Sequence, residues 1–435
     1  MTITHKQAAT RVAAGLGRPV QDSLEAAVVL EALGGLRSPT ALALAPGALE
    51  ESSPSGDGGL RPRTHGVVTA VSTREMLGLV TTLLATTAWV APLGSALGSD
   101  ATARAWQVAL PISIALQWIL RRRGMNGPDG LSGLRGDTLV VTAAAVTGLL
   151  VPVLLVLSPA VMLPGALIVT WVGGLLVVVR GWGVAYGASL VVATVLLALG
   201  VPVVIDILLI LAITNVAVVL AWLTSPPSGT RPTPWRRCLP AGSIGFLLAL
   251  LIVTDPSVEW SSSAPFPVLA LVPSLLASIW ANKHLNLVWT VLVSALASTM
   301  LVDRSQRRNW RVFTRIILGS FARLLLATVV ISVLAFVLLR GSATSDAGLF
   351  SLLLGLGAFG IVGFLAALLE SFSRPVAALG VTTAALVGAQ VALHGPMPVM
   401  QGSSLAAAAV VAVLAASWPI AQLVRRPDRT LATII

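Results

Sequence analysis

Two ionisable side chains lie within long apolar runs of this sequence, and their chemistry gives the first indication of function. Arg323 lies in the run 316–339, where its guanidinium could bind a phosphate group through two parallel hydrogen bonds. A side chain that extends to the lipid headgroups explains the same position, so both interpretations stay open. Asp206 follows Pro202 at the start of another run, which favours a carboxylate near a helix N-terminus over a proton or cation site.

Further polar residues within or beside the apolar runs complete the set that could act on a substrate. Arginines at the ends of the runs could bind an anion, and amides could line a path through the membrane. Hydrogen bonds between helices explain such amides equally well. The candidates for substrate binding, besides Arg323, are Arg104, Arg340, Gln107, Asn215 and Gln390, and Asp206 is the candidate for a coupling ion.

Sequence patterns of known catalytic and metal sites are missing. No pair of carboxylates stands at helical spacing inside an apolar run, and no His-Glu-x-x-His or Gly-x-Ser-x-Gly motif lies there. The four histidines are scattered along the chain, so we expect no metal and no cofactor. The sequence therefore predicts a protein that is not an enzyme.

The composition indicates that lipid is the solvent for most of the chain. Of its 435 residues, 56% are hydrophobic and 10% are charged, whereas about 25% charged residues are usual in soluble proteins. So few polar residues could not cover the surface of a soluble domain. The single cysteine, Cys238, excludes an internal disulfide framework.

Apolar runs long enough to cross a bilayer recur from residue 76 onward, since a helix of roughly 20 residues spans the hydrocarbon core. Gly200 and Pro202 interrupt one run that is too long for a single crossing, so we expect a helical hairpin to turn there. We predict twelve transmembrane helices, at 76–97, 105–120, 138–158, 160–179, 184–201, 203–222, 239–254, 267–282, 316–339, 348–369, 376–393 and 404–423.

The distribution of basic residues predicts the orientation of these helices, because short cytoplasmic loops carry an excess of Lys and Arg. With both termini inside, all 28 basic residues except Arg104, Arg323 and Arg340 lie on the cytoplasmic side. A crossing at 285–302 would move many of them outside, so we predict that this segment does not cross. The net charge of +11 therefore indicates topology, and we expect no nucleic-acid partner. The predicted location is the bacterial inner membrane.

The chain divides into a small N-terminal segment and two membrane bundles. The capping box Asp22-Ser23-Leu24-Glu25 predicts a helical hairpin before Pro46, and residues 22–45 are a candidate docking surface for a cytoplasmic protein. The predicted units are the N-terminal segment 1–45, a flexible linker 46–75, a first six-helix bundle 76–222, a cytoplasmic linker 223–239, a second six-helix bundle 240–424 with a cytoplasmic helical extension 283–315, and a cytoplasmic tail 425–435.

Residues Pro273-Ser274-Leu275-Leu276 open a predicted span that continues as a long helix into a basic cytoplasmic stretch. Together with the six-plus-six layout, this feature resembles the multidrug/oligosaccharidyl-lipid/polysaccharide exporter superfamily, particularly its bacterial polysaccharide flippases. The resemblance implies an all-α transporter that works by alternating access between two bundles. No coupling-ion motif of that superfamily can be placed in this sequence.

Our hypothesis is a flippase that moves an amphiphilic anionic substrate, a lipid-linked glycan, in contact with membrane lipids, with Arg323 as the phosphate ligand. Two alternatives stay open. One is a membrane scaffold that recruits cytoplasmic enzymes through the N-terminal hairpin and the basic face at 303–315. The other is an exporter of small molecules.

Overall fold

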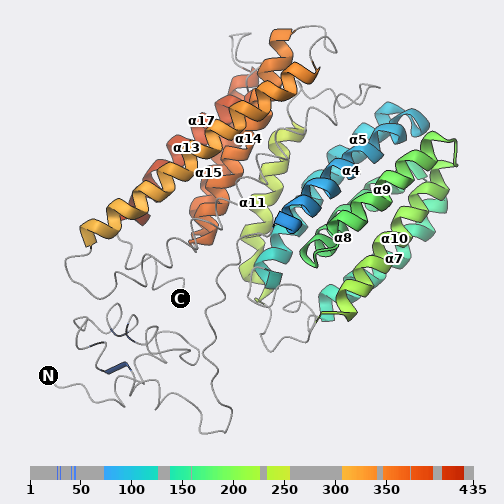
Figure 1. Ribbon diagram of the computed structural model, residues 1–435, viewed down its shortest axis with the longest axis horizontal. Coiled ribbons are helices and arrows are strands. Elements are labelled where there is room, and N and C mark those ends of the chain that lie inside the picture. The colour runs from blue at the N-terminus through green and yellow to red at the C-terminus, as the bar shows by residue number, and fades with distance from the viewer. Residues whose placement is uncertain are drawn as a thin grey trace.

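The described part of the chain is all-α (Figure 1). The computed structural model describes residues 73–125, 138–157, 159–225, 233–254, 306–339, 346–372, 374–394 and 404–425, together with Ala27, Leu30, Ala41, Leu44 and Ala45. Its helices are α4 (Thr73–Leu97), α5 (Ser99–Leu120), the π-helical turn η1 (Arg121–Met125), α7 (Thr138–Leu157), α8 (Pro159–Val179), α9 (Gly183–Ala198), α10 (Val203–Leu223), α11 (Trp235–Val253), α13 (Gln306–Leu339), α14 (Asp346–Ser371), α15 (Pro375–His394) and α17 (Ser404–Arg425).

Eleven of the twelve predicted transmembrane helices coincide with a described helix. The remaining one, at 267–282, lies outside the described residues, as does the segment 285–302. The predicted turn between α9 and α10 is confirmed, since Gly200 adopts a φ of 91° there. Glycine suits this left-handed backbone because it has no Cβ to clash with the neighbouring carbonyl.

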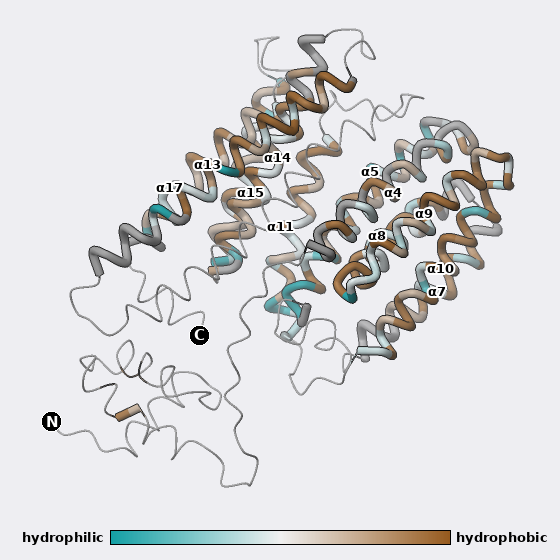
Figure 2. Tube along the Cα trace, viewed as in Figure 1, coloured by the Kyte–Doolittle hydropathy of each residue, from teal (hydrophilic) through white to brown (hydrophobic). Residues whose placement is uncertain are grey.

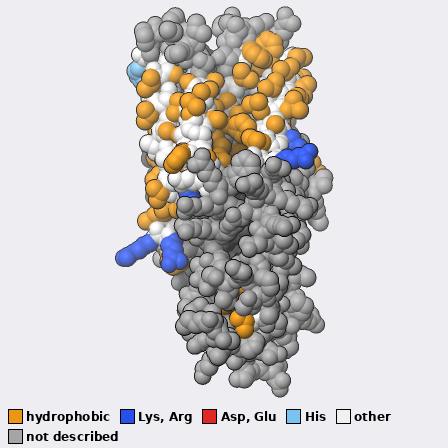
Figure 3. Space-filling model, turned by 90° about the vertical axis from the view of Figure 1, so that its left-hand side faces the viewer, with side chains coloured by type: hydrophobic (Ala, Val, Ile, Leu, Met, Phe, Trp, Pro, Cys, Tyr) orange, Lys and Arg blue, Asp and Glu red, His pale blue; other side chains and the backbone are white. Residues whose placement is uncertain are grey.

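Apolar side chains cover the outside of the helices as well as their contacts. Six of the described helices, α10, α11, α13, α14, α15 and α17, contain segments long and apolar enough to cross a membrane, and Figure 2 shows hydrophobic residues along most of the helical length. Large outward side chains include Leu149, which is 74% exposed, and Leu338, which is 83% exposed. Hydrophobic groups dominate the described part of the face in Figure 3. The chain is a multi-pass membrane protein.

The helices form two groups with α11 between them (Figure 1). The first group comprises α4, α5 and α7 to α10, and the second comprises α13, α14, α15 and α17. Helix α11 packs on α5 of the first group and on α14 and α15 of the second. At Gly242 and Gly245, its backbone lies against Ile119 and Trp118 of α5, so small residues permit the close approach.

Several boundaries differ from the predictions. Helix α13 begins at Gln306, so most of the basic stretch predicted as a separate surface element is continuous with the following transmembrane helix. Helix α11 begins at Trp235, inside the predicted linker 223–239, because Pro234 is its N-cap and no residue breaks the helix before the apolar run. Of the N-terminal hairpin, the described residues are helical, and Ala27, Leu30, Ala41 and Ala45 are buried. The rest of that hairpin lies outside the described residues.

Candidate functional site

A buried carboxyl group joins two helices of the first group. Asp206 lies in the first turn of α10 and is 0% exposed. Trp89 of α4, also 0% exposed, donates its indole N–H to Oδ2 of Asp206 over 2.7 Å. The other carboxyl oxygen, Oδ1, is buried and has no hydrogen-bond partner among the described residues. Asp206 is thus a partly satisfied acid inside an apolar bundle.

The helices around Asp206 supply no described charge that could neutralise it. Helix α10 packs against α4, α7, α8 and α9. Within the described ranges of these four helices, the only charged residues are Arg74 and Glu75 at the start of α4. Glu75 precedes Trp89 by fourteen residues, which corresponds to about 21 Å along a helix. Tyr186 on α9 is the one further titratable group in these helices.

Hydroxyl groups extend the buried polar region of the first group. The hydroxyl of Tyr186 on α9 contacts Oγ1 of Thr214 on α10 at 2.7 Å, and it donates to the carbonyl of Thr170 on α8 at 3.2 Å. Thr214 lies two turns beyond Asp206 on α10. Thr82 on α4 donates to the carbonyl of Gly183 on α9 at 2.9 Å. Four helices are therefore held together by polar contacts in an interior that is otherwise apolar.

A second polar cluster lies at the opposite end of the helices from Asp206, where η1 follows α5. Nη1 of Arg122 lies 3.4 Å from Oε1 of Glu370, whose side chain on α14 is 10% exposed. Arg123 donates to the carbonyl of Thr233 over 2.7 Å, and Thr233 donates back to the carbonyl of Arg123 over 2.8 Å. The cluster connects η1 with the start of α11 and the end of α14.

In this cluster, burial and the carboxylate of Glu370 have opposite effects on the pKa of Arg121. The guanidinium of Arg123 lies 4.3 Å from the centre of the Trp235 ring, a favourable cation–π geometry. Desolvation by burial lowers the pKa of Arg121 from its ordinary value, and the nearby carboxylate of Glu370 acts in the raising direction. Two arginines, Arg121 and Arg122, therefore act on one buried carboxylate, that of Glu370.

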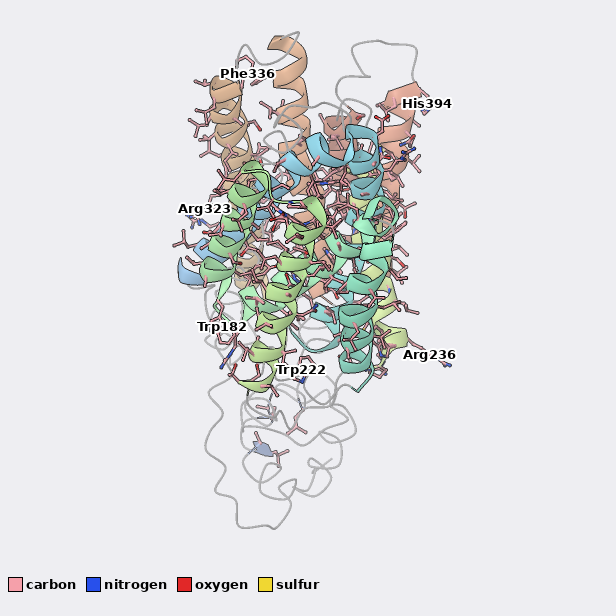
Figure 4. All side chains as sticks on the ribbon, turned by 90° about the vertical axis from the view of Figure 1, so that its right-hand side faces the viewer. Trp182, Trp222, Arg236, Arg323, Phe336 and His394 are labelled. Carbon is pink, nitrogen blue, oxygen red and sulfur yellow. The ribbon has the colours of Figure 1, made fainter. Side chains whose placement is uncertain are left out.

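The predicted substrate-binding residues lie apart from one another. Arg323 is exposed on α13, and Figure 4 places its side chain at the outer edge of the molecule. Its neighbours Leu325 and Leu326 are 47% and 65% exposed, so this face of α13 is oriented toward lipid. Arg104 is exposed on α5, and Gln107 on the same helix is half-buried.

The other predicted amides connect helices. Nδ2 of Asn215 donates to the carbonyl of Gly148 on α7 over 3.4 Å, and Nε2 of Gln390 donates to Oγ1 of Thr254 over 3.1 Å. Arg340 lies outside the described residues. Within the described part of the chain, no hydrogen bond or ion pair joins any two of the predicted candidates. No three His, Cys, Asp or Glu residues there lie close enough to hold a metal ion.

Two residues of these clusters escaped the sequence analysis. Glu370 stands at the end of the apolar run of α14, where a terminal acid resembles an ordinary interfacial residue. Trp89 is an apolar residue within a run, and only its indole N–H near a carboxylate gives it a polar role. A search for acids next to apolar runs would have found Glu370.

Comparison with known proteins finds solved structures whose helical layout is similar and whose sequence identity to this chain is low. No family model matches the chain, and no curated protein matches it. Similar solved structures include an outward-facing multidrug resistance MATE family transporter of the MOP superfamily, with 14% identity, a TM-score of 0.48, and coverage of 85% of this chain and 97% of the other. A MATE structure in the bent conformation has 14% identity, a TM-score of 0.47, and coverage of 85% and 98%.

A eukaryotic MATE transporter has 10% identity, a TM-score of 0.41, and coverage of 98% of this chain and 99% of the other. These structures belong to the superfamily that the sequence resembles, and the likeness concerns the helical layout alone. The function proposed below rests on contacts within this chain.

Proposed function

We propose that this chain is a proton-coupled membrane transporter of small amphiphilic molecules, in which Asp206 takes up and releases the coupling proton. The observation that supports the proposal is the environment of Asp206, which is 0% exposed and has Trp89 as its hydrogen-bond donor. Ionisable residues inside membrane helices are costly, and they commonly serve ion or substrate pathways.

A proton on Asp206 would change the contact between α4 and α10. Hydrogen bonds to an ionised carboxylate are roughly twice as strong as those to a neutral acceptor. The ionised form therefore holds the indole of Trp89 more tightly, and the neutral form releases it more readily. A lone buried charge is costly, so uptake of a proton also removes the desolvation cost of the charged carboxylate, whose Oδ1 has no hydrogen-bond partner among the described residues. Proton exchange at one residue thus alters how two helices pack.

The arrangement of helices suits alternating access. Helix α11 contacts both helical groups, and buried apolar residues of the two groups and of α11 form one continuous core. Relative rotation of two such groups exposes a central path first to one side of the membrane and then to the other. Asp206 lies inside the first group, where a change in packing would alter the shape that this group presents to the second.

The position of Arg323 favours a small-molecule substrate over a lipid-linked glycan. An anionic substrate moved between the two groups would need a cation facing the path, whereas Arg323 projects from the lipid-facing side of α13 (Figure 4). An arginine on that surface can extend its guanidinium to the headgroups, which explains the residue without a substrate. The buried ionisable group in the first group, Asp206 on α10, is instead an acid, which suits a neutral or cationic substrate.

Transport by purified protein in liposomes tests this proposal. With ethidium as the probe and an imposed proton gradient, Asp206→Asn is expected to reduce uptake by about tenfold or more, because it removes the titratable group. The matched control is Asp100→Asn, which changes an exposed acid on α5 and should transport normally. Gradient-driven uptake by Asp206→Asn at the wild-type rate would contradict the proposal.

Infrared difference spectra provide a readout that needs no substrate. Spectra recorded between acidic and basic pH should contain a protonated carboxyl band that disappears in Asp206→Asn and persists in Asp100→Asn. A spectrum that is unchanged by Asp206→Asn would mean that Asp206 does not exchange a proton in this range.

One observation favours a second candidate function, a flippase for lipid-linked glycans. A guanidinium among exposed leucines on the lipid-facing side of α13 could bind the phosphate of a lipid that moves along the outside of the bundle. A fluorescent polyprenyl diphosphate disaccharide in the same liposomes distinguishes the two functions. Its translocation, with no uptake of ethidium, would favour the flippase.

A further inference from the structure

We propose that the ion pair between Arg122 and Glu370 is a reversible latch between the two helical groups, and that it opens when the transporter changes conformation. The inference rests on the proposed transport function. It concerns the end of the molecule that carries η1, where Trp182, Trp222 and Arg236 also lie, opposite to Phe336 and His394 (Figure 4).

The arginine side of the latch is fixed to the first group and to α11. Helix α5 continues directly into η1, and α5 packs tightly on α11. Reciprocal hydrogen bonds between Arg123 and Thr233, of 2.7 and 2.8 Å, tie η1 to the start of α11. The Trp235 ring adds a cation–π contact at 4.3 Å from the guanidinium of Arg123. Arg122 therefore projects from a well-anchored turn.

The acid side of the latch belongs to the second group. Glu370 lies near the end of α14, which packs against α13, α15 and α17. Its neighbours Leu368 and Leu369 are 0% exposed, and Phe372 is 2% exposed, so the backbone here is held in a packed core. Movement of the second group as a body would carry Glu370 with it and would separate the two charges.

The contact has the strength that a reversible link requires. Its shortest N–O distance is 3.4 Å, and the side chains of Arg122 and Glu370 are 37% and 10% exposed. A fully exposed pair contributes almost nothing to stability, whereas removing one partner of a fully buried pair is strongly destabilising. This pair lies between the two limits. When the latch opens, Arg122 can turn to water, and Arg121 remains close enough to Glu370 to share its charge.

The contact between α5 and α11 keeps α11 with the first group. Gly242 and Gly245 of α11 allow a close approach to Ile119 and Trp118 of α5, and the hydrogen bonds between Arg123 and Thr233 join the same two elements at the η1 end. A motion that separates Arg122 from Glu370 would therefore take place between this unit and the second group. The ion pair is a directional contact across that boundary.

Distance measurement between two spin labels tests the latch. Labels at Leu223→Cys on α10 and Val376→Cys on α15, two exposed positions near this end of the two groups, are introduced into a Cys238→Ala background in lipid nanodiscs. Glu370→Gln should raise the ratio of long to short distances by about tenfold, an effect between those of exposed and buried pairs. Arg122→Gln should act in the same direction from the more exposed partner.

Two controls separate a latch from a general loss of structure. The charge reversal that combines Arg122→Glu with Glu370→Arg should restore the short distance. Arg374→Gln, which removes a 2.9 Å bond to Gln422 inside the second group, should leave the distances unchanged. Unchanged distances in both Glu370→Gln and Arg122→Gln would overturn the latch. Because no substrate or proton gradient is present, this result does not depend on whether Asp206→Asn still transports.

Discussion

Gly183 at the start of α9 lies directly against the backbone of Gly78 on α4. A Cβ added at Gly183 would lie 2.8 Å from the Cα, the carbonyl carbon and the carbonyl oxygen of Gly78. Helices can approach this closely only where both residues lack a side chain. The same pair of helices carries Trp89 and the hydrogen bond from Thr82 to Gly183, so the glycine contact sets the spacing on which the buried polar region depends.

Replacement of Gly183 by alanine should therefore destabilise the protein. Backbone atoms cannot move aside as a flexible side chain can, so overpacking is expected to cost roughly 1–3 kcal/mol. Thermal unfolding in detergent measures the effect. Gly380→Ala on α15 is the matched control, because a Cβ there meets no atom within 4 Å. It should preserve or slightly raise the melting temperature, since alanine favours helix over glycine. Equal melting temperatures for the two variants would argue against the close contact.

Trp89→Phe should weaken the first helical group by removing the hydrogen bond to Asp206. A hydrogen bond to an ionised group contributes about 1.5–3 kcal/mol, and the aromatic ring of phenylalanine preserves much of the packing. The stability loss should largely disappear when Asp206→Leu is already present, because leucine has no acceptor for the indole N–H, and a double-mutant cycle measures this. Trp418→Phe, at a position that is 64% exposed on α17, should have little effect in either background. An equal loss with and without Asp206 would mean that only packing had changed.

Arg323→Ala should leave ethidium uptake within about twofold of the wild-type rate, because a guanidinium oriented to lipid makes no contact with the proposed path. Arg323→Lys should behave in the same way. If the protein is instead a flippase, translocation of the fluorescent polyprenyl diphosphate disaccharide should depend on Arg323. There, the alanine variant would lose activity, and the lysine variant would retain only part of it, since an ammonium cannot form the paired hydrogen bonds of arginine.

The lengths of the apolar runs were sufficient to predict most of the helices. A helix in lipid must bond its own backbone groups, so an uninterrupted apolar run of about 20 residues has few alternatives. The turn at Gly200 was equally accessible, because glycine followed by proline interrupts a run that is too long for one crossing. The start of α13 could not be predicted from the sequence, since polar residues after Gln306 continue a helix as readily as they end one.

The contacts between helices could not be predicted from the sequence pattern. Leucine and valine occur on all sides of α13, so periodicity could not reveal that Arg323 lies on its outward face. Trp89 and Asp206 are separated by 117 positions along the chain. Arg122 and Glu370 lie even farther apart, on helices of different groups. Their pairing depends on how the groups dock, which no local signal encodes.

Because α13 is one continuous helix, its transmembrane part and its basic N-terminal part must tilt together. Its 34 residues correspond to a rod of about 51 Å, whereas the hydrocarbon core of a bilayer is about 30 Å thick. The apolar segment Ile317–Leu338 takes up one part of the rod, and the part before it carries Arg307, Arg308, Arg311 and Arg315. Any tilt of α13 within the membrane would displace this basic arm in proportion to its length. A tilt of about 3–5° around the middle of the apolar segment would therefore move the start of α13 by about 2–3 Å at the charged surface of the bilayer.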